Sequence, residues 1–191
     1  MRHRTFIAVP ASPDVRHGAL RLIERLRRAG AAVDDVKWVA PQNLHWTLQF
    51  LGDVEELDIP EVSKAVEQGA AEQQPFDIEA HGAGAFPSAD RPRTLWIGAS
   101  QGGREMAALQ QAIQRRLRKR GYRGEERRFV PHITLGRTRA RGRPQSLSDE
   151  LAALADYDAG TMRVDEVTVF SSELGPDGPT YNPLARAPLG T

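Results

Sequence analysis

The sequence "NLHWTLQF" runs from Asn43 to Phe50 and "VPHITLGR" runs from Val130 to Arg137, so His-x-Thr-Leu occurs twice in one chain. Each copy alternates polar and apolar residues, which is the pattern of a β-strand with one buried face. Because successive side chains of a strand point to opposite faces, the His and the Thr of each copy should share a face. The repeat therefore predicts two strands that each present an imidazole and a hydroxyl away from the core.

Alternation assigns the other residues of the two strands as well. The predicted core face carries the apolar side chains, namely Trp46, Leu48, Phe50, Ile133 and Leu135. The predicted opposite face carries the polar residues and one glycine, namely His45, Thr47, Gln49, His132, Thr134 and Gly136. Strict alternation places Arg137 on the core face. A role for Arg137 beside His132 therefore requires the strand to twist or end at Gly136.

The four polar side chains suit chemistry on a phosphodiester. An imidazole has an ordinary pKa of about 6.5, so a pair can supply one base and one acid near pH 7. One His can deprotonate the nucleophile and the other can protonate the leaving oxygen, while the two Thr hydroxyls bind the non-bridging oxygens. Arg137, which closes the second motif, can add a bidentate phosphate contact.

Other chemistries find less support in the sequence. Paired histidines also suit zinc, but there is no His-x-His, no His-Glu-x-x-His and no third ligand in either motif. His3, His17 and His81 have no partner pattern and are expected on the surface or in loops. The absence of Cys excludes disulfides, thiolate nucleophiles and Cys-ligated metals. Neither a Gly-x-Ser-x-Gly elbow nor a Gly-x-x-x-x-Gly-Lys loop is present.

Hydrophobic periodicity predicts interleaved strands and helices along the 191 residues. The predicted helices are Asp14–Ala29, Ile59–Ala71, Met106–Arg120 and Ser148–Ala155. The predicted strands are Thr5–Val9, Lys37–Ala40, Leu44–Leu51, Phe76–Ala80, Thr94–Ala99 and Arg163–Ser171, followed by an extended C-terminal "TYNPLARAPL". The Gly/Pro-rich "HGAGAFPSADRPR" is predicted to be a loop. Trp38 and Trp96 are expected in the strand core, and Phe86 and Tyr122 are weak candidates for stacking on a base.

Charge is distributed unevenly although the net charge is only +1. Twelve basic and two acidic residues lie between Arg115 and Arg143, while the stretch from Asp53 to Glu72 is acidic. The basic run favours a polyanionic partner such as RNA, and the alternative is a solvated helix end and loop. The N-terminus resembles a strand rather than a signal peptide, and no apolar stretch approaches ~20 residues. We therefore expect a cytosolic protein with no membrane partner.

The motifs and their order resemble the two-histidine (2H) phosphoesterases, and within them the RNA 2′,3′-cyclic phosphodiesterases, also called 2′-5′ RNA ligases. The resemblance covers nearly the whole chain, since it extends over "RTFIAVP", "NLHWTLQFLGDV", "GAFPSADRPRTLWIG", "RRFVPHITLGR" and "VTVFSSELGPDGPTYNPL". It implies an α+β fold in which residues 1–191 form a single domain. This domain has two pseudo-symmetric lobes of antiparallel sheet with outer helices around a central cleft. Trp46 and Gly136 depart from the commoner aliphatic residue and Ala, but neither puts a side chain on the reacting face.

The same resemblance implies an activity and its residues. His45 and His132 would be the catalytic pair, Thr47, Thr134 and Arg137 would bind the phosphate, and no metal or other cofactor would be needed. The expected reaction opens a terminal 2′,3′-cyclic phosphate of RNA or a nucleotide to a 2′-phosphomonoester. The alternatives are 2′-5′ ligation as the physiological direction and a non-catalytic module that binds RNA ends. We expect a monomer.

Overall fold

The computed structural model describes residues 1–28, 36–124, 128–138, 145–176 and 178–190. Within these ranges the strands are β1 (Arg2–Pro10), β2 (Val36–Trp38), β3 (His45–Glu55), β4 (Phe76–Phe86), β5 (Thr94–Ala99), β6 (Ile133–Thr138), β7 (Asp158–Val164), β8 (Glu166–Gly175) and β9 (Gly178–Pro188). The helices are α1 (Pro13–Arg28), α2 (Ile59–Ala70), α3 (Gly103–Arg118) and α4 (Gln145–Ala153), with short 3-10 turns η2 (Pro41–Asn43) and η3 (Glu56–Asp58).

All nine strands belong to one curled antiparallel sheet in the order β7-β4-β5-β6-β3-β1-β8-β9, and β2 pairs with β6. The two motif strands are the central ones, because β3 pairs with β6 through Trp46 and Ile133. Four strands lie on each side of this junction, in the matching sequences β6-β5-β4-β7 and β3-β1-β8-β9. The α+β prediction with a paired arrangement of halves is confirmed, whereas the central cleft stays a prediction.

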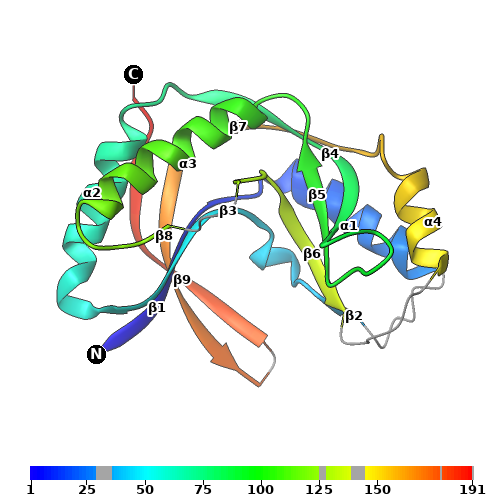
Figure 1. Ribbon diagram of the computed structural model, residues 1–191, viewed down its shortest axis with the longest axis horizontal. Coiled ribbons are helices and arrows are strands. Elements are labelled where there is room, and N and C mark those ends of the chain that lie inside the picture. The colour runs from blue at the N-terminus through cyan, green and yellow to red at the C-terminus, as the bar shows by residue number, and fades with distance from the viewer. Residues whose placement is uncertain (29–35, 125–127, 139–144, 177, 191) are drawn as a thin grey trace.

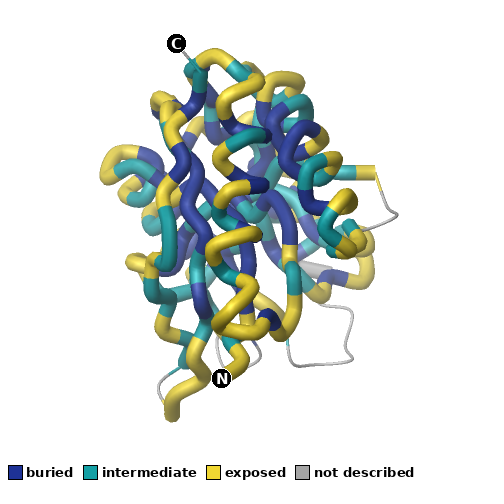
Figure 2. Tube along the Cα trace, turned by 90° about the vertical axis from the view of Figure 1, so that its left-hand side faces the viewer, coloured by how far each residue is buried: buried dark blue, intermediate teal, exposed yellow. Residues whose placement is uncertain are grey.

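The helices cover the sheet in two pairs. In Figure 1, α2 and α3 lie over the half that contains β1, β8 and β9, while α1 and α4 lie over the half that contains β4 to β6. Helix α1 turns one face inward, with Val15, Leu22 and Leu26 fully buried at helical spacing. Buried positions concentrate between helices and sheet, and exposed positions lie outside (Figure 2). This packing leaves the other face of the central strands for the polar motif residues.

Several predicted boundaries were wrong. The segment "HGAGAF" belongs to β4, which runs on to Phe86, because Gly84 pairs with Trp96 of β5 and Gly82 lies in a bulge of the same ladder rather than in a turn. Helix α3 begins at Gly103, ahead of the predicted Met106, and the predicted strand from Arg163 is divided between β7 and β8 around Asp165. The predicted end of the first helix at Ala29 lies outside the described residues.

In the described part of the chain, no helix has both the length and the apolar character needed to cross a membrane.

Candidate active site

The two His-x-Thr motifs meet at the centre of the sheet. Trp46 pairs with Ile133 in antiparallel register, and both side chains are fully buried on the helix-covered face. Antiparallel pairing around this contact places His45 beside Thr134 and Thr47 beside His132. The four polar side chains, each partly exposed, therefore share the opposite face. The structure brings together the four residues that the sequence singled out.

Each imidazole is held by the same hydrogen bond two residues back along the chain. Nδ1 of His45 lies 2.6 Å from the carbonyl oxygen of Asn43, and Nδ1 of His132 lies 2.7 Å from that of Val130. A carbonyl oxygen can only accept, so Nδ1 donates in both rings and Nε2 carries the lone pair of the neutral form. The Thr47 hydroxyl donates to Nε2 of His45 at 2.9 Å. Both reactive nitrogens are thus fixed as Nε2.

Aromatic rings enclose both histidines. His45 contacts Phe6 at a centroid distance of 5.1 Å and meets Tyr181 edge-on at 5.5 Å. His132 meets Phe86 edge-on at 5.0 Å, and Trp96 lies 6.4 Å away. Trp96 was predicted in the core, but it lies partly exposed on the site face because its neighbours Leu95 and Ile97 take the buried side of β5.

The remaining aromatic and histidine predictions have separate outcomes. Phe86 lies in β4 and not in a loop, and its role in stacking on a base stays a prediction. Tyr122 packs against the hydrophobic core, where burial and Asp58 raise the pKa of its hydroxyl. His17 is exposed on α1, while His3 in β1 and His81 in β4 are partly exposed.

Burial sets the charge state of His45. Removal from water lowers the pKa of His45, the hydrogen bond to Asn43 opposes this shift, and the nearby His132 adds a further lowering, so that the pKa is about 4. His45 is therefore neutral at pH 7 in the free protein. The contribution from His132 shows that the two rings are close enough to influence each other's protonation. Within the described ranges, no group of three or more His, Cys, Asp or Glu side chains could hold a metal ion.

Matching β-bulges follow both motifs. On β1, Ala8 pairs with Thr47 and Ile7 pairs with Gln49, so Leu48 has no partner. On β5, Trp96 pairs with Thr134 and Leu95 pairs with Gly136, so Leu135 has no partner on that strand. An extra residue in one strand reverses the alternation beyond it. At the Leu of each His-x-Thr-Leu motif, the order of buried and exposed side chains along the strand is therefore reversed.

The first bulge corrects two predictions for β3. Gln49 was expected on the site face but is buried, and Phe50 was expected in the core but is 52% exposed. Phe50 lies against the site-facing ring of Phe6, with 5.9 Å between the centroids. Phe50 therefore belongs to the same face as His45.

The second bulge resolves the position of Arg137. Beyond Leu135, Gly136 is buried and Arg137 is exposed. The bulge thus reverses the alternation of the strand, as a role for Arg137 beside His132 requires. A Cβ on Gly136 would lie only 2.9 Å from Val36 and 3.0 Å from Trp38, both on the covering strand β2. Glycine at this position lets β2 approach closely. Arg137 also acts on Tyr181, where its charge opposes the burial that raises the pKa of that phenol.

Three site residues escaped the sequence analysis: Asn43, Tyr181 and Arg4. Asn43 is 8% exposed, and its Nδ2 donates to the carbonyl oxygen of Pro179 at 2.8 Å, so β9 holds the residue that in turn holds His45. Arg4 acts on Tyr181 in the same direction as Arg137. Asn43 and Tyr181 stand in the quoted stretches "NLHWTLQF" and "TYNPL", but only the fold shows that they meet at the site.

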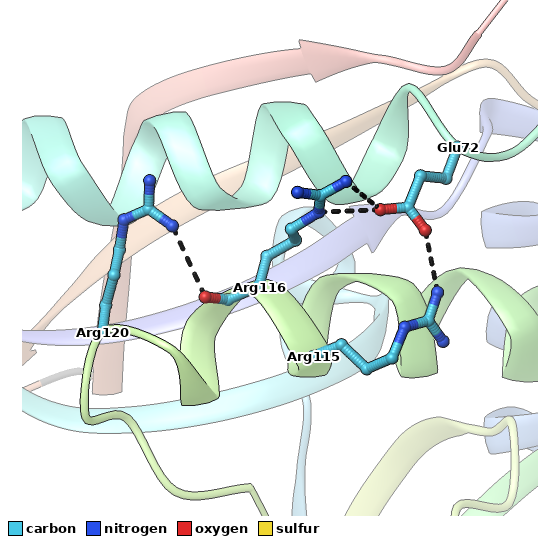
Figure 3. A network of polar contacts seen from close by, with 4 residues as sticks. All are labelled: Glu72, Arg115, Arg116 and Arg120. Atoms are coloured by element: carbon cyan, nitrogen blue, oxygen red, sulfur yellow. Dashed lines mark hydrogen bonds and ion pairs between the residues drawn. The ribbon is translucent and has the colours of Figure 1, made fainter.

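Three arginines at the end of α3 and just after it form ion pairs with acidic residues on α2 and just after it. Glu72 accepts ion pairs from Arg115 at 2.8 Å and Arg116 at 2.6 Å (Figure 3), and Arg120 pairs with Glu61 at 3.2 Å. The acidic stretch seen in the sequence thus faces the basic one across α2 and α3. These three arginines support the solvated-helix alternative rather than an RNA track. Outside the described residues lie Arg127, Arg139, Arg141 and Arg143.

Comparison of the sequence with known proteins gives a consistent result. The family model of the 2′-5′ RNA ligase superfamily matches residues 12–176. An RNA 2′,3′-cyclic phosphodiesterase from Methanothermobacter thermautotrophicus is 35% identical over 184 residues, which are 96% of this chain and 97% of that protein. A protein of the same name from Aquifex aeolicus is 37% identical over 155 residues, covering 81% and 82% of the two chains.

Solved structures share the fold. TT0787 of Thermus thermophilus superposes with a TM-score of 0.79 at 26% identity, covering 97% of both chains. LigT of E. coli in its apo form superposes with a TM-score of 0.75 at 24% identity, covering 100% of this chain and 99% of that one. The curled sheet with paired helices is therefore an architecture already known from crystal structures.

Proposed function

The chain belongs to the 2′-5′ RNA ligase superfamily, and from that premise we propose that it is an RNA 2′,3′-cyclic phosphodiesterase with His45 and His132 as its acid and base. The observation that carries the proposal is the meeting of both His-x-Thr motifs on the central strands, each His bonded through Nδ1 to a carbonyl. The relatives named RNA 2′,3′-cyclic phosphodiesterase are up to 37% identical to this chain, which supports the same substrate class.

Hydrolysis needs one proton removed and one supplied. The Nε2 of one neutral imidazole takes a proton from water as the oxygen attacks phosphorus. The P–O3′ bond breaks as Nε2–H of the other, protonated imidazole gives its proton to the leaving O3′. The products are a 2′-phosphomonoester and a 3′-hydroxyl, and the two rings have exchanged protonation states.

The remaining site residues bind charge. The Thr47 and Thr134 hydroxyls donate to the non-bridging oxygens, on which negative charge increases in the transition state. Thr47 now donates to His45, so a bound phosphate oxygen would take over that hydrogen bond and leave Nε2 for the proton transfer. Arg137 is exposed on the same face and supplies a charge-assisted contact to the phosphate.

The second candidate is 2′-5′ ligation as the physiological reaction, and the family's ligase description favours it. A 5′-hydroxyl in place of water attacks the same cyclic phosphate: one neutral imidazole takes the proton of the 5′-hydroxyl, the P–O3′ bond breaks, and the protonated imidazole gives its proton to O3′. The products are a 2′-5′ linkage and a 3′-hydroxyl, and the two histidines keep the roles they have in hydrolysis. A third candidate is a module that binds cyclic ends without turnover. Identification of the product from a 2′,3′-cyclic end, with and without a 5′-hydroxyl acceptor, distinguishes the three.

The decisive experiment measures hydrolysis of a 2′,3′-cyclic mononucleotide in saturating EDTA. We expect turnover without added metal, and we expect His45→Ala and His132→Ala each to lower kcat by roughly 10²–10⁴. Thr47→Ala and Thr134→Ala should cost less, because each removes one charge-assisted hydrogen bond worth about 1.5–3 kcal/mol. His17→Ala, a substitution on α1, is the matched control. Near wild-type turnover in a folded His45 or His132 variant would contradict the mechanism.

The same preparation tests the remaining expectations. We expect a cytosolic monomer that needs no cofactor and no membrane. Sedimentation at micromolar concentration measures the oligomeric state, and a stable dimer would correct this expectation.

A further inference from the structure

Phe50 occupies a place on the site face that corresponds to that of Arg137. Both residues come two positions after the bulged Leu of their motif, Phe50 after Leu48 and Arg137 after Leu135. Each faces a strand that flanks the motif pair, since Phe50 pairs with Phe6 and Arg137 pairs with Thr94. The sheet thus presents an exposed cation beyond one motif and an exposed aromatic ring beyond the other.

The surroundings of Phe50 continue in one direction away from His45. The ring of Phe6 lies between them, 5.1 Å from His45 and 5.9 Å from Phe50, and Phe6 itself is 3% exposed. Arg4 lies two residues before Phe6 on β1 and therefore on the same face. Arg4 is exposed and makes no ion pair with any residue in the described ranges. Moving away from His45 on the site face, one therefore meets the half-exposed ring of Phe50 and the guanidinium of Arg4, which has no ion pair in the described ranges.

We propose that Phe50 and Arg4 form a subsite for the nucleotide that precedes the cyclic end of an RNA strand, with its base on the Phe50 ring and its phosphate on Arg4. An exposed aromatic face beside a cation is the pairing that binds single-stranded RNA, through stacking and through charge. This inference rests on the proposed function, because it takes the cyclic phosphate to lie between His45 and His132.

Position assigns Phe50 to the preceding nucleotide rather than to the terminal one. The rings that contact the histidines directly are Phe6, Tyr181, Phe86 and Trp96, and these enclose the terminal nucleotide. Phe50 lies one ring farther out, in the direction in which β1 carries Arg4. The site is therefore built for an oligonucleotide end, and a free cyclic mononucleotide uses only part of it.

The test compares a cyclic mononucleotide with a dinucleotide that ends in the same 2′,3′-cyclic phosphate. Phe50→Ala and Phe50→Leu should lower the ratio of kcat/KM for the dinucleotide to that for the mononucleotide about tenfold, mostly through KM, because stacking remote from the reacting atoms contributes to ground-state binding. Phe50→Tyr keeps the ring and should keep the ratio. Arg4→Ala should also lower the ratio, and it should reduce the slope of log kcat/KM against log salt for the dinucleotide by about 1.

Matched controls lie away from the site. Leu57 is 90% exposed in η3, and Arg118 is exposed on α3, so Leu57→Ala and Arg118→Ala should leave the ratio unchanged. A wild-type ratio in Phe50→Ala, or an equal loss on both substrates, would overturn the subsite while leaving the proposed function in place. Failure of the wild-type protein to hydrolyse either substrate would overturn the proposed function, and the subsite with it.

Discussion

At the scale of single residues, the burial of His45 links the site to the stability of the fold. Its pKa is about 4 in the folded state and about 6.5 when unfolded, so between these values only the unfolded chain takes up the proton. The free energy of unfolding should therefore fall by about 3 kcal/mol as the pH drops from about 6.5 to about 4. Above about pH 6.5 the ring is neutral in both states, so His45 adds nothing to the pH dependence of stability there.

This prediction is measured by urea unfolding of the wild type and His45→Phe across the pH range. The Phe ring does not titrate, so the difference between the two proteins isolates the histidine. An NMR titration of the imidazole gives the folded pKa directly. A midpoint near 6.5 for His45 would show that the ring is solvated and that the predicted loss of stability is wrong.

The catalytic roles of the two histidines also show in the pH dependence of turnover. With one His neutral and the other protonated, kcat/KM should be bell-shaped, and its two apparent pKa values belong to the coupled pair. Removal of His45 should abolish one limb in the residual activity. Loss of the acidic limb identifies His45 as the base, and loss of the alkaline limb identifies it as the acid. Retention of both limbs would exclude His45 from proton transfer.

Asn43 is expected to position His45 through its backbone carbonyl oxygen, which accepts the hydrogen bond from Nδ1. Asn43→Ala leaves the Pro179 carbonyl without its buried donor, which should cost about 1–3 kcal/mol of stability. It also loosens the backbone that accepts the Nδ1 hydrogen bond, so kcat should fall, though less than in His45→Ala. Gln42→Ala, at the exposed neighbouring position, is the control. If Asn43→Ala unfolds more easily but turns over normally, Asn43 has only a structural role.

At the scale of secondary structure, the bulges mark where reasoning from sequence stops. His45, Thr47, His132 and Thr134 were placed correctly because they lie before the bulges, where a period of two holds. Phe50 was misplaced because it lies after one. The bulge at Leu48 is a property of its pairing with β1, and no residue near Leu48 encodes that distant partner. The alternation of a strand therefore predicts its faces only as far as the register is regular.

The glycines of β4 were read as a loop for a similar reason. Gly84 has no side chain, which leaves room for the Trp96 indole to lie on its backbone. A Cβ at that position would lie 2.3 Å from the ring. Gly84→Ala should therefore displace Trp96 from beside His132, at a cost of about 1–3 kcal/mol for overpacking and with a fall in kcat. Gly103→Ala, whose Cβ would meet only Ala99 at 3.7 Å, is the control and should be neutral or slightly stabilising. Unchanged stability and Trp fluorescence in Gly84→Ala would contradict the packing.

At the scale of the whole molecule, the α+β class and the paired halves followed from the sequence, but the crossing of the helices did not. Helix α1 follows β1 in the chain, yet it packs on β7 of the other half. Helix α3 follows β5, yet it packs on α2, which covers β8 and β9 of the opposite half. Which half a helix packs on depends on how well its apolar face fits that of the sheet. Local periodicity identifies the apolar face of a helix but does not predict its partner. The two expected halves therefore exchange helices, so that each half of the sheet is covered by a helix that follows the other half in the chain.

This exchange predicts how residues 1–191 unfold. Because each half buries its sheet under a helix from the other, neither half keeps a complete core alone, and the chain should unfold in one cooperative transition. Circular dichroism reports the helices, while fluorescence reports the three tryptophans, Trp38, Trp46 and Trp96, on β2, β3 and β5, and their urea midpoints should coincide. Tyr157→Phe removes the hydroxyl that donates to Gly18 on α1 at 2.9 Å, a contact between the halves. It should lower both midpoints together, by about 0.5–1.5 kcal/mol in free energy. Separate midpoints, or a shift in only one signal, would show two independent domains in place of one.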